Sequence, residues 1–165
     1  RLQKKIHKIG EKRIMKKIIL GLFLILGVIS FAIPKNLDAN KLKKAGYEIT
    51  SEEENAIIFG KSTQTAGITV ALFNGASSPK NINISLRETA PKSQKFLSSR
   101  ENKRAYISKY KDNEYNGFTY SFVAKNSKSK DTVVSVLYMT DKELKDAELD
   151  KTIEQTLNEI ESFLK

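Results

Sequence analysis

The sequence predicts an α+β fold, in which an antiparallel sheet is packed by a C-terminal amphipathic helix and by one further helix. Two patterns carry this prediction. Phe118, Tyr120 and Phe122 alternate with the residues between them, and a polar turn at 126–131 then leads to a second β-favouring segment at 132–139, which is typical of a β-hairpin. The last stretch repeats apolar residues at steps of three and four, as an amphipathic helix does (Leu149, Ile153, Leu157, Ile160, Leu164). Early strands, a middle helix, a late hairpin and a closing helix together indicate the α+β class.

The first part of the domain predicts a short helical turn followed by a meander of strands. Residues 41–44 form the turn, which Gly46 ends. Three segments rich in β-favouring residues follow, separated by polar and turn-like residues: 47–50, 56–59 and 67–73.

The middle of the chain predicts one more strand and the second helix. After a loop at 74–80, Ile82, Ile84 and Leu86 alternate with polar residues, which indicates a half-buried strand over 82–87. Pro91 then stands where a first helical turn would place it, with Phe96 and Leu97 following, so that a helix is expected before a strand at 105–110.

Residues 15–32 have the organisation of a bacterial signal peptide. Met15 and two lysines precede an uninterrupted apolar stretch at 18–29, and the small residues Ser30 and Ala32 form an A-x-A-like cleavage site. Cleavage near Ala32 predicts an exported protein, periplasmic or secreted, that begins near Ile33. The alternative is an uncleaved inner-membrane signal anchor, and the chain would then contact the membrane through this segment alone.

The leader divides the chain into four regions. Residues 1–14 are expected to be a non-native upstream extension, because a complete leader with its own methionine follows them. After the signal peptide at 15–32, residues 33–46 form a polar lead-in. Residues 47–165 are expected to form a single α+β domain.

The net charge of +10 does not indicate a nucleic-acid partner. The first 32 residues hold 8 of the 29 basic residues but only one of the 19 acidic ones. The remainder therefore has 21 basic against 18 acidic residues, a nearly balanced surface.

The amino-acid composition excludes several reaction classes for the exported part. His7, in the upstream extension, is the only histidine, and the chain has no cysteine. Ser-His-Asp and Cys-His catalysis, zinc sites built on His or Cys, and thiol redox chemistry all need one of these residues. No catalytic residue, metal site or cofactor is therefore predicted. Asp112, Glu114, Asn116 and Gly117 begin like a calcium loop, but its twelfth position is Val123, so a hairpin turn is expected instead.

A basic segment at 92–111 is the candidate contact surface. It has seven basic residues against one acid, a local charge of +6, with two tyrosines interleaved. Such a patch suits an anionic partner. The alternative is self-pairing within the fold, since residues 141–161 have a net charge of −5. The predicted contact residues are Arg100, Lys103, Arg104, Tyr106, Lys109, Tyr110 and Lys111.

The order of elements over 47–165, with a strong strand running into the final helix (VVSVLYMTDKELKDAELDKTIEQTLNEIESFL), resembles small exported PsbP-like and DcrB-like α/β sandwich domains. This resemblance implies an accessory or binding module, and it assigns no site residue. We therefore expect a noncatalytic exported domain that contacts an anionic envelope component or a partner protein. The alternative function is a carboxylate-dependent hydrolase, which requires two acids that converge in a cleft.

Overall fold

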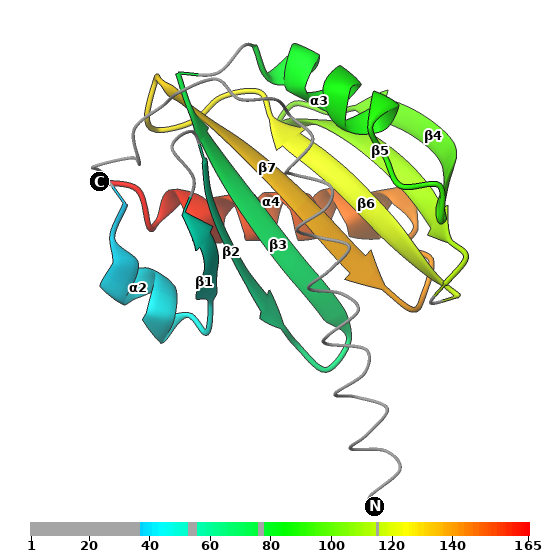
Figure 1. Cartoon of the computed structure of the whole chain (residues 1–165), viewed down its shortest axis with the longest axis horizontal. Coiled ribbons are helices and arrows are strands. Elements are labelled where there is room, and N and C mark those ends of the chain that lie inside the picture. Colours follow the sequence, from blue (N-terminus) through cyan, green and yellow to red (C-terminus); the bar gives the residue numbers. More distant parts are fainter. Residues whose placement is uncertain (1–36, 53–55, 76–77, 115) are drawn as a thin grey trace, which may run out of the picture.

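A computed structural model describes residues 37–52, 56–75, 78–114 and 116–165, which contain a seven-stranded antiparallel sheet (Figure 1). The α+β fold class predicted from the sequence is confirmed. The strands are β1 (Glu48–Glu52), β2 (Ala56–Ser62), β3 (Ala66–Asn74), β4 (Gln94–Glu101), β5 (Ala105–Asp112), β6 (Gly117–Ala124) and β7 (Thr132–Thr140).

The predicted signal peptide and upstream extension lie outside the described residues. Among the residues that the structure does describe, no helix is long and apolar enough to cross a membrane.

The sheet has the order β1-β2-β3-β7-β6-β5-β4 and is antiparallel throughout. Strands β1 to β3 form one meander and β4 to β7 a second. The two meanders meet where β7 pairs with β3 along its whole length, from Ala66 opposite Thr140 to Asn74 opposite Thr132. Consequently β1 and β4 are the two edge strands, and they lie at opposite sides of the sheet (Figure 1).

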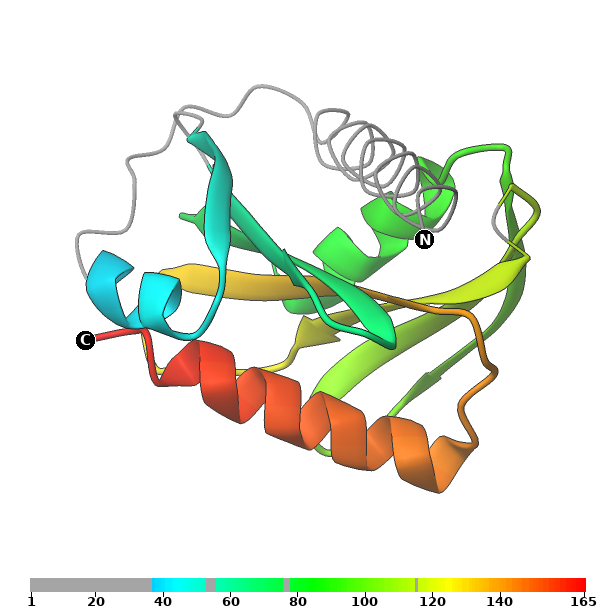
Figure 2. The same cartoon turned by 90° about the horizontal axis from the view of Figure 1, so that it is seen from below.

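The C-terminal helix α4 (Asp146–Glu161) covers one face of the sheet, as its periodicity predicted (Figure 2). Its buried stripe includes Leu149, Ile153, Leu157 and Ile160, which join one core cluster with side chains from β2, β3, β5, β6 and β7. Asp146 and Glu148 in the first turn favour this helix start, because acidic groups interact well with the N-terminal end of the helix dipole.

A short helix, α2 (Ala39–Lys44), precedes β1 and confirms the predicted helical turn. The Asp38 carboxylate caps it by accepting hydrogen bonds from the backbone N–H groups of Asn40 and Lys41, both at 3.1 Å. Gly46, at a φ of 86°, turns the chain into β1. The backbone N–H of Asp38 donates to the Phe163 carbonyl at 2.7 Å, so both ends of the described fold meet here.

The strand predicted over 82–87 is wrong, because residues 79–88 form helix α3 (Pro79–Glu88). Ser78 caps it by accepting a hydrogen bond from the N–H of Asn81, and Pro79 takes the first helical position. Ile82 and Leu86 stand one helical turn apart and pack on the sheet face opposite α4 (Figure 2). Ile82 and Leu86 fitted both periods, whereas Ile84 fitted only a strand, and the capping signals decide the outcome.

The helix expected from Pro91 is also wrong, since this segment becomes edge strand β4. The following strand at 105–110 is confirmed as β5, and the two pair antiparallel. A β-bulge lies between Phe96 and Ser98, where the register skips one residue. Such a bulge breaks the period-2 pattern by which a strand is recognised in a sequence.

Two buried serines on the α3 side of the sheet predict a stabilising substitution. The hydroxyl groups of Ser121 and Ser135 are fully enclosed and have no hydrogen-bond partner in the described part of the chain. Burial of an unpaired hydroxyl opposes folding, so Ser135→Ala should raise the free energy of unfolding by about 1 kcal/mol. Urea unfolding measures this change.

Ser108 is the matched control for that prediction. It is equally buried, but its hydroxyl donates to Asn83 Oδ1 at 3.4 Å. Ser108→Ala leaves that acceptor without its donor and should not stabilise the protein. Equal effects of the two substitutions would contradict the prediction.

Candidate functional site

The turn between β4 and β5 positions the predicted contact residues. The Asn102 side chain holds this turn, because its Oδ1 accepts hydrogen bonds from the backbone N–H groups of Arg104 at 2.8 Å and Ala105 at 2.9 Å. Its amide group also donates to Asp150 Oδ1 on α4 at 2.8 Å. One asparagine thus shapes the hairpin and fixes it to the helix.

Three of the predicted contact residues pair with acids of the C-terminal segment. Arg100 Nη2 lies 2.8 Å from Asp150 Oδ1, and Arg104 Nη1 lies 3.3 Å from Glu154 Oε1. Lys109 forms an ion pair with Glu143. We call these pairs the ion-pair cluster: Arg100, Arg104 and Lys109 with Asp146, Asp150, Glu154 and Glu143. The self-pairing alternative from the sequence therefore accounts for these three basic residues.

The ion-pair cluster lowers the pKa of Asp150. The hydrogen bond from Arg100 is the largest cause, and the Asn102 amide and the charge of Arg100 add to it, while partial burial opposes the shift. A carboxylate whose pKa is lower in the folded than in the unfolded state stabilises the fold above about pH 4, and this contribution is lost as the pH falls through the folded-state pKa. The side chain of Asp150 is 43 % exposed, so solvent screening keeps the contribution below about 1 kcal/mol.

Asp150→Asn should therefore lower the free energy of unfolding at pH 7 by less than about 1 kcal/mol. The difference from the unsubstituted protein should shrink as the pH falls through the folded-state pKa of Asp150, because the carboxyl group then becomes protonated in both states. Urea unfolding across this pH range measures the effect. Asp141→Asn, at an exposed acid outside the ion-pair cluster, is the control and should leave stability unchanged at pH 7. A constant difference between Asp150→Asn and the unsubstituted protein from pH 7 to pH 2 would contradict the assignment.

The two interleaved tyrosines are engaged within the fold. Tyr110 is only 2 % exposed, and burial raises its pKa. Tyr106 is half-buried, and the Lys125 ammonium lies 5.1 Å from its ring centroid. Neither ring therefore offers an open stacking face of the kind that the sequence analysis expected of the contact surface.

The remaining positive charge gathers at the other end of β4 and β5. Lys95 and Lys111 are direct cross-strand neighbours, on the side of the sheet that α4 covers. Neither lysine forms an ion pair within the described residues, and Lys111 instead lies 4.3 Å from the ring centroid of Phe118. Like charges directly opposite each other destabilise a sheet. Lys103, by contrast, is exposed in the β4–β5 turn, at the far end of the hairpin.

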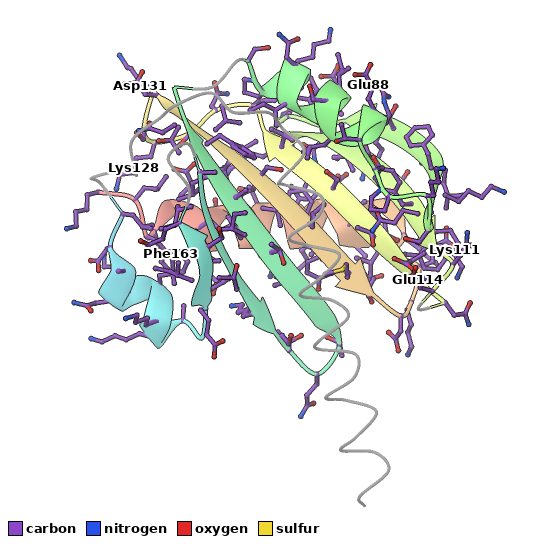
Figure 3. All side chains as sticks on the ribbon, viewed as in Figure 1. Glu88, Lys111, Glu114, Lys128, Asp131 and Phe163 are labelled. Atoms are coloured by element: carbon purple, nitrogen blue, oxygen red, sulfur yellow. The ribbon has the colours of Figure 1, made fainter. Side chains whose placement is uncertain are left out.

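Arg87 and Lys92 complete this group. Arg87, on α3, donates to Ser99 Oγ at 3.3 Å and lies 5.6 Å from the ring centroid of Phe96. Lys92 is exposed in the segment that leads into β4. We define the basic corner as Arg87, Lys92, Lys95 and Lys111. Glu114 lies at the same end of the molecule as Lys111, although no ion pair joins them (Figure 3).

Sequence reasoning missed two side chains at the basic corner, Phe96 and Leu97. It included Lys95 in the basic segment but placed all three residues in a helix. The signal that could have identified them is the mostly polar segment 95–101, whose two apolar residues are adjacent and follow no helical period. Such a segment suits an edge strand better than an amphipathic helix.

A groove of about 820 Å³ runs along the opposite edge of the sheet. Among the described residues that line it, Glu48 and Glu52 are the acidic ones. They project to opposite faces, because Glu48 pairs with Gly60 and Glu52 with Ile57, three residues away. The two described carboxylates of the groove are therefore not face to face, as the hydrolase alternative would require of them. Its lining residues are Lys43, Gly46, Tyr47, Glu48, Ile49, Thr50, Ser51 and Glu52.

Glu159 on α4 joins Tyr47 and Lys61 in a structural contact near this groove. Its Oε2 accepts a hydrogen bond from the Tyr47 hydroxyl at 3.0 Å, and its Oε1 lies 2.7 Å from Lys61 Nζ. The Lys61 ammonium also lies 4.3 Å from the Tyr47 ring centroid. Burial, followed by the charge of Glu159, raises the pKa of Tyr47. Both carboxylate oxygens are thus committed to holding the end of α4 against β1 and β2.

The hairpin turn that begins like a calcium loop joins β5 to β6, as expected. Asp112 is buried, and its Oδ1 accepts a hydrogen bond from the backbone N–H of Glu114 at 2.9 Å. Across the described residues, no group of three or more His, Cys, Asp or Glu side chains is arranged to hold a metal ion.

Comparison with known proteins gives no relative from which a function could be inferred. No protein-family model, curated protein or solved structure matches the chain. The resemblance to PsbP-like and DcrB-like domains stays a prediction, and the functional argument depends on the basic corner alone.

Proposed function

We propose that this chain is a noncatalytic exported binding domain, and that its basic corner contacts a phosphodiester-bearing anionic component of the cell envelope. The observation that carries the proposal is the direct opposition of Lys95 and Lys111, neither of which forms an ion pair with a carboxylate of the described residues. Two lysines at directly paired strand positions create a positive potential, which an anionic partner relieves. The predicted export places the domain where phospholipid head groups and phosphate-containing wall polymers are available.

The ion-pair cluster supports the same assignment by contrast. Arg100, Arg104 and Lys109 are already neutralised by acids on or just before α4. A partner would have to displace those acids in order to bind there. The basic corner needs no such displacement, and it therefore replaces the central part of the basic segment as the proposed contact surface.

The substitution Lys95→Glu with Lys111→Glu tests the proposal. Each lysine near an anionic surface contributes about 1 kcal/mol, so loss of both should weaken binding by roughly 30-fold, and the added acids should weaken it further. Binding is measured with protein recovered from the exported fraction, whose N-terminus is sequenced. The two probes are vesicles rich in phosphatidylglycerol and a soluble glycerol-phosphate polymer, at low ionic strength.

The matched control is Lys130→Glu with Lys151→Glu, which changes the net charge equally. Both lysines are exposed; Lys130 belongs to the β6–β7 turn, whose neighbours Lys128 and Asp131 lie far from Lys111 (Figure 3). The control should retain most of the binding. Equal losses in the two double variants would show that only net charge matters, and absence of binding to both probes by the unsubstituted protein would refute the proposed function.

A further inference from the structure

Phe96 and Leu97 are exposed apolar side chains at the basic corner. They are 43 % and 42 % exposed, and no other large hydrophobic residue of the described ranges is as open to solvent. Single exposed apolar residues are common on protein surfaces. These two are consecutive, and they lie on an edge strand with no neighbour on its outer side within the described sheet.

The bulge in β4 determines where the two side chains lie. Phe96 pairs with Tyr110 and Ser98 pairs with Lys109, so Leu97 is the extra residue with no partner on β5. A bulge of this kind bends the strand and redirects the side chain that it carries. Phe96 is held in place by Tyr110, whose ring it meets edge-on at a centroid distance of 5.8 Å, and by Arg87. The apolar pair therefore occupies a fixed position at the rim of the sheet.

Cationic groups lie on both sides of this pair. Lys95 and Lys111 belong to the face that α4 covers, whereas Arg87 approaches from α3 on the opposite face. Phe96 and Leu97 thus project from between positively charged groups. Peripheral proteins that bind anionic membranes use the same combination, with cations for the head groups and apolar side chains for the region beneath them.

We propose that the basic corner docks on an anionic phospholipid membrane and inserts Phe96 and Leu97 into the region just beneath the lipid head groups. This inference rests on the proposed function and commits it to lipid instead of a wall polymer. The sequence predicted a membrane contact only through an uncleaved leader, and this inference adds a contact made by the folded domain. A second copy of the chain fits this surface less well, because two partly exposed side chains offer roughly 150 Å², whereas a stable interface needs about 800 Å² from each partner.

The absence of tryptophan from the chain makes insertion directly observable. Phe96→Trp creates a protein with a single indole at the proposed insertion point. With phosphatidylglycerol vesicles, its emission should shift to the blue and be quenched by lipids brominated in the acyl chain. Gln155→Trp, at an exposed position on α4, is the control and should show neither change.

Phe96→Ser with Leu97→Ser separates insertion from charge attraction. This variant should lose about tenfold in affinity for the vesicles and keep its affinity for the soluble glycerol-phosphate polymer. Its thermal unfolding should stay cooperative with a somewhat lower midpoint, because the substitution removes the contacts of Phe96 with Tyr110 and Arg87, and binding is compared well below that midpoint. The conservative Phe96→Trp variant reports membrane insertion without the double serine substitution, so the test does not depend on the stability of that variant.

Three outcomes overturn the inference. Vesicle binding that depends on Lys95 and Lys111 but not on the apolar pair, without a tryptophan shift, leaves the proposed function standing and excludes insertion. A blue shift that appears with rising protein concentration and no vesicles assigns the surface to a second copy. Lack of binding to both vesicles and polymer refutes the proposed function together with the insertion.

Discussion

Ile153→Ala should lower the free energy of unfolding by about 4 kcal/mol. Ile153 is fully buried in the middle of α4 and belongs to the cluster that joins this helix to the sheet. The substitution removes apolar atoms from a site that packed neighbours enclose on every side, so a cavity remains. Equilibrium urea unfolding, followed by far-ultraviolet circular dichroism, measures the loss as a lower midpoint with an unchanged slope.

Gln155→Ala is the matched control on the same helix. Gln155 lies two residues away on the exposed side of α4, and alanine is the best helix former, so this change should be within about 0.5 kcal/mol of neutral. A loss below about 1.5 kcal/mol for Ile153→Ala would mean that α4 packs too loosely to be the main cover of this face.

The sequence predicted α4 correctly because one physical effect dominates there. A 16-residue helix with one buried stripe has apolar residues at steps of three and four along its whole length. A strand has a period of two and does not produce this pattern. The β6–β7 hairpin was equally clear. Alternate residues of its strands face α4, and the residues between them face the α3 side of the sheet. The polar turn between the strands marks where the hairpin reverses.

The two wrong elements, α3 and β4, fail for a shared reason. In each of them, the alternation of apolar and polar residues was a misleading guide to the secondary structure. In α3 the alternation of Ile82, Ile84 and Leu86 suggested a strand although Ile82 and Leu86 share a helical face, and the Ser78–Pro79 start was the better indicator. In β4 the bulge at Leu97 removed the alternation altogether.

The candidate site was predictable in its charge and not in its geometry. The net charges of the segments 92–111 and 141–161 indicated self-pairing, which the structure confirms for Arg100, Arg104 and Lys109. Which lysines stay unpaired depends on how far α4 extends across the sheet, a tertiary feature. The exposure of Phe96 and Leu97 likewise depends on β4 being an edge strand, and strand order cannot be read from local sequence.

Gly117→Ala should destabilise the protein by about 3 kcal/mol, although the change adds a single methyl group. Gly117 opens β6, and a Cβ atom built there would lie 2.6 Å from the backbone oxygen of Thr140. That oxygen belongs to the end of β7 and cannot rotate away as a side chain would. The added carbon must therefore push apart the ends of β6 and β7, or break the pairing of Phe118 with Thr140. Urea unfolding should show the loss of stability, and amide hydrogen exchange should be fastest at this end of the two strands.

Asn116→Gly tests whether backbone contact, and not the turn itself, is responsible. Asn116 has a φ of 52°, which glycine adopts without strain, so this substitution should leave stability within about 0.5 kcal/mol of the unsubstituted protein. A similar loss in both variants would place the sensitivity in the turn. If Gly117→Ala has no effect, the approach of Thr140 must be looser than 2.6 Å. The glycine that made this segment look like the start of a calcium loop is thus explained by the passage of a neighbouring backbone.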